Sequence, residues 1–241
     1  MANPVMKVME ESHILEGEPM TVSGSINKTL VLLGLLVLAA SYTWGLIAKG
    51  FTDMASMLML GGAVVGFVIA MVICFTRKAL PVLTPVYAAC EGLFIGGISA
   101  LYAGQYTGIV LQAVILTFAV MFSMLLLYKA RIIQCTETFR SVILTATLSV
   151  CAVYLIQIIA NLFGRGIPQI FTASPIGIGF SVIVVLIAAF NFIIDFDFIE
   201  RGEQNMIPKD FEWYGAFGLM VTLVWLYLEV LRLLAKVNSR R

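Results

Sequence analysis

Charged residues are scarce in this chain. Of its 241 residues, 12% are charged and 61% are hydrophobic, and the mean hydropathy is +1.00. A soluble domain carries about twice that share of charge. With only 15 Lys and Arg and 14 Asp and Glu, the chain cannot give so much apolar surface a polar coat. We therefore predict an integral membrane protein whose main solvent is the lipid bilayer.

Histidine and paired cysteines are nearly absent as well. The single histidine, His13, lies in a polar N-terminal stretch, which excludes His-based catalysis, haem ligation and zinc hydrolysis at membrane depth. The four cysteines form no closely spaced pair, so neither a disulfide framework nor a zinc site is indicated. With a net charge of +1 and thinly spread basic residues, we expect no nucleic-acid partner.

Other membrane functions lack their characteristic residues. A retinal protein needs a lysine in the middle of its last helix, and the nearest here is Lys236 at its end. The Gly-rich loop of a nucleotide-driven pump is missing. An intramembrane protease needs paired catalytic groups on facing helices, whereas Asp195 and Asp197 share one helix. We expect neither an enzyme nor a cofactor.

Seven long apolar runs follow the polar residues 1–28. Each is close to the roughly 20 residues that a helix needs to cross the hydrocarbon, and their continuity favours helices over strands. We therefore predict an all-α, polytopic membrane protein with a polar tail at 1–28 and one seven-helix transmembrane domain at 29–241. The runs cover residues 30–48, 54–75, 80–102, 109–128, 142–163, 176–198 and 211–235.

The orientation is less strongly determined than the number of helices. If all seven runs cross, nine of the 15 Lys and Arg share the side of the N-terminus and six lie on the other side, which favours a cytoplasmic N-terminus. If one run were re-entrant, the count would become thirteen against two of the same 15. A six-crossing form thus remains an alternative.

A few ionisable residues interrupt the apolar runs. Glu91 lies within the third run, Asp195 and Asp197 lie late in the sixth, and Glu229 lies in the last, while Arg77 follows the second. A charge in hydrocarbon is costly, so such residues are functional candidates. Carboxylate oxygens bind both H⁺ and Ca²⁺, which suggests a proton-sensitive gate or a cation pathway.

Each acid also has a structural explanation. Asp197 can be the solvated end of its helix, and Glu229 can pair with Arg232 at i+3. Glu91 has no charged neighbour within its own helix, so it must be protonated or reach another helix. Asp195 stands between apolar residues and must face a cavity or a partner. Function is the favoured reading for Asp195 and Glu91.

Three motifs combine apolar residues with single acids: NFIIDFDFIE at 191–200, WLYLEVLRLL at 225–234 and YAACEGLFIGG at 87–97. They resemble the Bax inhibitor family, the transmembrane Bax inhibitor motif proteins, in its bacterial branch. The resemblance implies seven helices with the last one surrounded by the others. It also implies a pH-sensitive Ca²⁺ leak channel or H⁺-coupled exchanger in the bacterial plasma membrane.

The resemblance also implies roles for individual residues. Asp195 and Glu229 match two acids that share a proton and could bind Ca²⁺, and Arg77 is the nearest match to an arginine that holds the first acid. However, 34 residues separate the two acids. If the sixth helix ends near Phe198 and the last begins near Phe211, Asp195 lies roughly 5 Å and Glu229 roughly 27 Å inside. They can meet only if the sixth helix continues past Gly202 and the last begins outside the hydrocarbon.

The primary hypothesis is a passive, pH-gated cation pathway, with Asp195, Glu229 and Arg77 as sensor and gate and Glu91 and Asp197 along the path. Ca²⁺ is the favoured ion because its ligands are carboxylate and carbonyl oxygens. The alternative is a regulator of membrane stress or protein quality control that binds a partner, such as a membrane protease, through the N-terminal tail. A small-solute transporter is a weaker third possibility.

Overall fold

The computed structural model describes residues 18–76, 79–164, 170 and 172–240. This part of the chain contains seven long helices, each long and apolar enough to cross a bilayer. The predicted all-α, seven-helix membrane fold is therefore confirmed. The helices are α2 (Val22–Ala48), α3 (Thr52–Thr76), α4 (Leu80–Gln105), α5 (Ile109–Lys129), α6 (Glu137–Leu162), α8 (Pro175–Gln204) and α9 (Phe211–Asn238).

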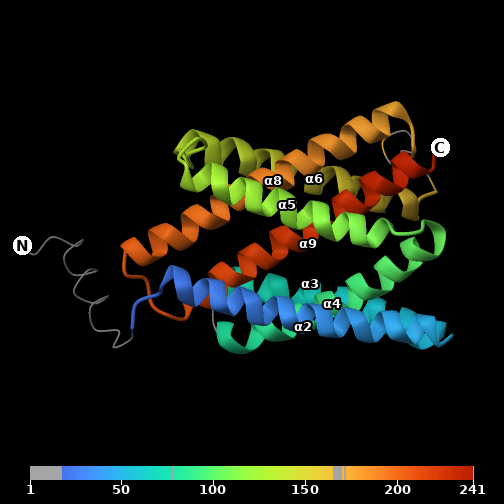
Figure 1. Cartoon of the computed structure of the whole chain (residues 1–241), viewed down its shortest axis with the longest axis horizontal. Helices are drawn as coiled ribbons and strands as arrows, with labels where there is room; N and C mark the ends of the chain where they lie inside the picture. The colour runs from blue at the N-terminus through green and yellow to red at the C-terminus, as the bar shows by residue number, and fades with distance from the viewer. Residues whose placement is uncertain (1–17, 77–78, 165–169, 171, 241) are drawn as a thin grey trace, which may run out of the picture.

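Successive helices run in opposite directions along the bundle (Figure 1). The start of α2 and the end of α9 consequently lie at opposite ends, as seven crossings require. In the six-crossing alternative they would lie at the same end. We call the end that holds the start of α2 and the α8–α9 turn the hairpin end.

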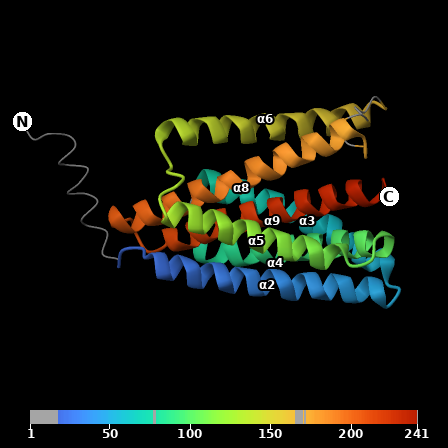
Figure 2. The ribbon, with the colours of Figure 1, turned by 45° about the horizontal axis from the view of Figure 1, so that its top comes forward.

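The last helix lies at the centre of the bundle. In α9, 61% of the most apolar 18-residue window is buried, compared with 11–39% in the other six helices. It packs mainly against α2, α4, α5 and α8, whereas α3 packs on α4 and α6 packs on α8 (Figure 2). The central position implied by the family resemblance is confirmed, with α3 and α6 forming an outer layer.

Glycines bring α4 close to its neighbours. A Cβ atom at Gly96 would collide with the backbone of Ala40 in α2, and one at Gly62 in α3 would lie 2.6 Å from the carbonyl oxygen of Cys90. Between membrane helices such close packing replaces the hydrophobic driving force that water would supply. The helices are thus held together by close approach of their backbones as well as by side-chain packing.

Two helices extend well beyond their apolar runs. The helix α2 begins at Val22 rather than at residue 30, because the Thr21 side chain caps it by accepting a hydrogen bond from the Gly24 N–H. The helix α8 continues to Gln204 rather than ending near Phe198, since the Glu, Arg and Gln residues that follow are good helix formers. Hydropathy detects only the part of a helix that lies in the hydrocarbon.

Candidate functional site

Asp195 of α8 faces the central helix. Its Oδ2 accepts a hydrogen bond of 2.6 Å from the Thr222 hydroxyl of α9. One turn earlier in α9, Gly218 leaves room for the carboxylate, because a Cβ atom there would lie 3.2 Å from Asp195 Oδ1. The hydrogen-bonding partner of this acid is therefore a neutral hydroxyl on the most buried helix of the bundle.

The longer helices place Asp195 deeper than the apolar runs alone predict. Nine residues separate it from the end of α8 at Gln204, and eleven separate Thr222 from the start of α9 at Phe211. At 1.5 Å per residue these segments are about 14 Å and about 16 Å long. The carboxylate thus lies well inside the bundle, on the hairpin-end side of its middle.

Glu229 has a different set of partners. Only 2% of the residue is exposed, and Arg232 Nη1 lies 2.9 and 3.2 Å from its two carboxylate oxygens. The Tyr154 hydroxyl of α6 donates a bond of 2.7 Å to the same carboxylate and accepts one of 2.7 Å from Arg232. The predicted i, i+3 ion pair is present, so Arg232 compensates the negative charge of Glu229 within the same helix.

The structure does not bring Asp195 and Glu229 together. Thr222, the partner of Asp195, lies seven residues before Glu229 in α9, which is about 10 Å along the helix. Although α8 does continue past Gly202, the two carboxylates still bind separate groups. A shared proton or a shared Ca²⁺ between them finds no support in this geometry.

Asp197 occupies the opposite side of α8 from Asp195, because two residues turn a helix by about 200°. It is only 6% exposed, so it is not a solvated helix end. Its Oδ2 lies 2.8 Å from Arg201 Nε in the next turn and 3.5 Å from Arg140 Nη2 of α6. This acid is a buried, doubly paired charge that joins α6 to α8.

The α5–α6 loop completes the surroundings of Asp197. Arg201 donates a hydrogen bond of 3.1 Å to the Cys135 carbonyl oxygen. Burial raises the pKa of the Cys135 thiol to about 11, and the negative charge of Asp197 adds to the increase. At neutral pH this thiol stays protonated and unreactive, so the cluster is electrostatic rather than nucleophilic.

Glu91 of α4 faces α3 across a glycine. A Cβ atom at Gly66 would lie 3.3 Å from Glu91 Oε1, and the side chain also interacts with Tyr87 one turn earlier in α4. Glu91 therefore lies against α3, one of the two possibilities that the sequence left open, and it meets a glycine there rather than a charged side chain. It lies on the far side of α4 from the Ala40 contact and remains a separate candidate from Asp195.

The predicted latch residue, Arg77, lies outside the described residues, as does Lys78. The helix α3 ends at Thr76, at the hairpin end, where α8 also ends (Figure 1). The pairing of Arg77 with Asp195 accordingly stays a prediction.

The sequence did not predict that residues 18–28 pack against the α8–α9 turn. We call these residues and their contacts with residues 202–212 the N-terminal clamp. Glu212, 1% exposed, accepts hydrogen bonds of 2.8 and 3.0 Å from the N–H and hydroxyl of Thr21 and forms an ion pair with Lys28. Glu212 is buried although it lies at the start of the last apolar run. The signal for this contact in the sequence is the opposite charge of Lys28, just before the first run, and Glu212.

Main-chain bonds reinforce the clamp. The Met20 N–H donates to the Ile207 carbonyl oxygen at 2.8 Å, and the Lys209 N–H donates to that of Glu18 at 3.0 Å. Met20 is fully buried against Gly202, where a Cβ atom would collide with its sulfur. Residues 18–25 are therefore part of the packed bundle.

An exposed ion pair between Glu18 and Lys209 lies at the edge of the clamp. The lysine lowers the pKa of the Glu18 carboxyl through a hydrogen bond and its charge, and the glutamate raises the pKa of Lys209 in the same way. Both groups thus stay charged across the neutral pH range.

No group of three or more His, Cys, Asp or Glu side chains that could hold a metal occurs among the residues that the structure describes. Within the described residues the acids are dispersed, and those that form ion pairs are Glu18, Glu137, Asp197, Glu212 and Glu229. These residues do not fit a resident Ca²⁺ site, and Ca²⁺ enters the argument below only as a transported ion.

Comparison with known protein families gave one match that covers nearly the whole chain. The model of the family described as Bax inhibitor 1 like matches residues 3–239. The comparison with curated proteins gave no match. The family match includes all seven helices and every acid discussed above.

Proposed function

The chain belongs to the Bax inhibitor 1 like family, and we propose that it forms a pH-sensitive cation pathway in the cell membrane, with Asp195 as the proton sensor. The cargo we favour is Ca²⁺, moving passively down its gradient. The proposal places the N-terminus in the cytoplasm, in line with the excess of Lys and Arg at the hairpin end.

The surroundings of Asp195 carry this proposal. The carboxylate lies inside the bundle against α9, and its hydrogen-bonding partner is the uncharged Thr222. A carboxyl group away from water is costly in its ionised form unless a cation compensates the charge, and protonation removes that cost. Its charge state can therefore respond both to pH and to a passing cation, and Ca²⁺ prefers oxygen ligands of this kind.

The other buried acids are less suited to sense protons. Asp197, Glu229 and Glu212 each form an ion pair with an arginine or a lysine, so a cation already compensates the charge of each carboxylate. Within the part of the chain that the structure describes, Glu91 forms no ion pair and lies near Tyr87 and Gly66. We keep it as a second candidate position along the ion path.

Protonation of Asp195 supplies the switch. It removes a negative charge from the α8–α9 interface and with it the attraction to Arg77 that the family resemblance implies. H⁺ and Ca²⁺ then compete for the same oxygens, so a change in pH alters the affinity of the site for the cation. The α8–α9 contact at Gly218 and Thr222 is where the movement would begin.

Ca²⁺ flux into dye-loaded liposomes tests the proposal. Purified protein is scanned from about pH 5 to 8, the range in which shifted carboxylates titrate, as wild type, Asp195→Asn and Asp197→Asn. The two variants carry the same substitution in the same helix, two residues apart. We expect Asp195→Asn to abolish the pH dependence of the flux and Asp197→Asn to preserve it.

Two outcomes would overturn the assignment. If Asp195→Asn leaves the flux and its pH profile unchanged, Asp195 is not the sensor. If folded wild-type protein shows no flux at any pH, the cation pathway is wrong and the alternative, a regulator that binds a membrane partner, is favoured. Deleting residues 1–17 then tests the tail, whereas a longer deletion would also remove Met20 and Thr21 from the N-terminal clamp.

A further inference from the structure

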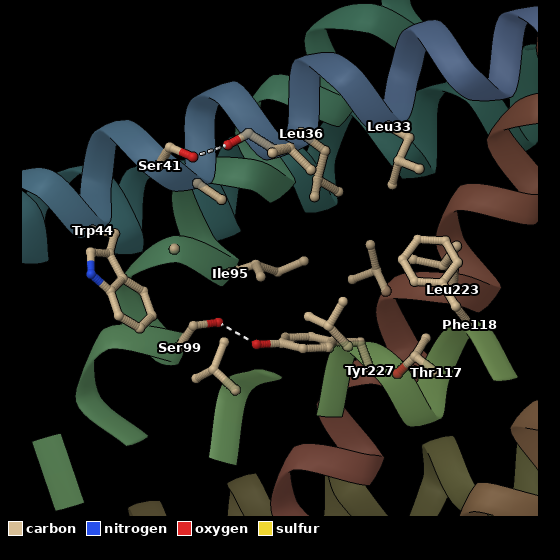
Figure 3. Close-up of a pocket in the computed structure, with 16 residues that line it drawn as sticks. Leu33, Leu36, Ser41, Trp44, Ile95, Ser99, Thr117, Phe118, Leu223 and Tyr227 are labelled. Carbon is tan, nitrogen blue, oxygen red and sulfur yellow. Dashed lines mark hydrogen bonds between the residues drawn. The ribbon is translucent and has the colours of Figure 1, made fainter. Parts of the chain in front are cut away.

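An apolar cavity of about 230 Å³ lies between α2, α4, α5 and α9 (Figure 3). Trp44 and Ser99 lie toward one end, and Leu33, Phe118 and Leu223 lie toward the other. For comparison, an apolar cavity of about 150 Å³ is large enough to bind benzene. This cavity is therefore large enough to hold part of a hydrocarbon chain.

The hydroxyl groups of the cavity are already hydrogen-bonded. The hydroxyls of Ser99 and Tyr227 bond to each other at 2.6 Å, and Ser41 and Thr117 donate to carbonyl oxygens of their own helices at 2.7 and 2.8 Å. The residues that line it include no acid and no basic residue. An apolar cavity whose hydroxyls are already bonded does not attract an ion, and the ligand that fits it is a hydrocarbon.

The cavity opens sideways, through the outer surface of the bundle. At its rim, Val37 of α2 is 52% exposed and Val114 of α5 is 36% exposed, whereas Ile95, Thr117 and Tyr227 deeper inside are 1–6% exposed. Because these helices span the membrane, the medium at that opening is lipid hydrocarbon. Acyl chains are thus the hydrocarbons at hand.

The length and position of the cavity match one leaflet. Along α2 it extends from Leu33 to Trp44, a distance of about 16 Å, which is about half of the hydrocarbon thickness of roughly 30 Å. Trp44 lies four residues before the end of α2 at Ala48, and the exposed Lys49 follows. Tryptophan prefers the membrane interface, and lysine there attracts phosphate.

We propose that this cavity binds one acyl chain of a membrane phospholipid, whose phosphate group lies near Lys49 at the end of α2. The chain would contact Leu223 and Tyr227 of the central helix. Leu223 directly follows Thr222, the partner of Asp195. The site is separate from the ion pathway proposed above and does not depend on it.

Photolabelling in membranes tests this proposal. The full chain is placed in liposomes that contain a small share of phospholipid with a diazirine near the end of one acyl chain, irradiated, digested and mapped by mass spectrometry. We expect adducts on Ile95, Thr117 or Leu223, which are at most 8% exposed and are out of reach of lipid that only surrounds the protein. Adducts confined to exposed positions such as Leu111, 66% exposed, would overturn the proposal.

Two variants of α5 provide the matched control. Val114→Trp fills the rim, whereas Ile115→Trp adds a similar ring at the next residue, which is 58% exposed and does not line the cavity. We expect Val114→Trp to lose the adducts on the buried residues while Leu111 remains labelled, and Ile115→Trp to keep both. Equal labelling in the two variants would contradict an entry through this rim.

A second probe separates phospholipid from other hydrocarbons. A free fatty acid with the same diazirine is added to liposomes of unlabelled phospholipid. Labelling of Ile95 or Thr117 by the phospholipid probe supports the proposal. Labelling by the fatty acid alone would overturn it in favour of a fatty-acid site. Val37→Trp, which closes the rim from α2, replaces Val114→Trp if that variant does not fold.

Discussion

Asp195 and Asp197 are separated by a single residue, yet their surroundings are opposite. Asp195 faces the central helix and accepts a hydrogen bond from a hydroxyl, whereas Asp197 faces α6 and lies between two arginines. Both side chains are removed from water at least in part. Burial alone thus does not distinguish an acid that holds the structure together from one whose charge can change.

The difference arises from which helix each acid meets. The α9 surface opposite Asp195 offers Gly218 and Thr222, and neither can carry a positive charge. The start of α6 opposite Asp197 offers Arg140. An arginine compensates the charge of a carboxylate, whereas a hydroxyl supplies only a hydrogen bond. The residue that each aspartate contacts, more than how deeply it is buried, therefore distinguishes the role of Asp195 from that of Asp197.

The largest effect on stability is expected for Asp197→Ala. Removing one member of a fully buried ion pair costs about 3–5 kcal/mol, and the partial exposure of Arg140 and Arg201 (32% and 46% of the side chains) reduces this to about 2 kcal/mol. Chemical denaturation in detergent measures it. Glu137→Ala serves as the control, since that side chain is 80% exposed and 3.7 Å from Arg201. Equal losses in the two variants would contradict a structural role specific to Asp197.

The next largest effect concerns the partner of Asp195. Thr222→Val keeps the side-chain shape but removes the donor to Asp195, so the variant should lose about 1 kcal/mol. Thr117→Val is the matched control, because this equally buried hydroxyl donates only to a carbonyl oxygen of its own helix. We expect the smaller loss there, and the same denaturation experiment compares them. A larger loss for Thr117→Val would show that Thr222 is not a specific partner of the acid.

Most of the fold could be predicted from the sequence. Hydrophobic runs near 20 residues are hard to place anywhere but across a bilayer, so the number, order and approximate positions of the helices follow from composition. The ends of α2 and α8 could not be predicted in this way. The start of α2 and the end of α8 consist mostly of polar residues, where capping by Thr21 and good helix formers after Phe198 decide the length.

The candidate site was only partly predictable, for a related reason. The pair of Glu229 with Arg232 follows from spacing within one helix, and so does that of Asp197 with Arg201. The contacts with Arg140 and Thr222 join helices that no local pattern relates. The 34-residue gap between Asp195 and Glu229 made their contact depend on where the two helices end. Although α8 extends to Gln204, each acid has its own partner, Thr222 or Arg232.

A smaller effect is expected for Arg140, the partner of Asp197 on α6. Its guanidinium lies 3.5 Å from the carboxylate and 32% of the side chain is exposed, so a double-mutant cycle of Arg140→Gln with Asp197→Asn should give a coupling of about 0.5–1 kcal/mol. The same cycle for Arg201, at 2.8 Å, should give more. A zero coupling for both arginines would mean that the Asp197 cluster does not differ from the Asp195 site in the way proposed.

The smallest effect is expected at the exposed pair of Glu18 and Lys209. This pair tests whether an ion pair at the hairpin end, rather than Asp195, could cause the pH dependence of the flux. The contribution of Glu18, whose pKa is lowered, is complete above the ordinary value of 4.5 and disappears as the pH falls through the lowered value. That of Lys209, whose pKa is raised, is complete below 10.5 and disappears as the pH rises through the raised value. Neither changes between about pH 5 and 8. Glu18→Gln should therefore leave the pH profile of Ca²⁺ flux unaltered, and a profile that flattened would move the sensor from Asp195 to the N-terminal clamp.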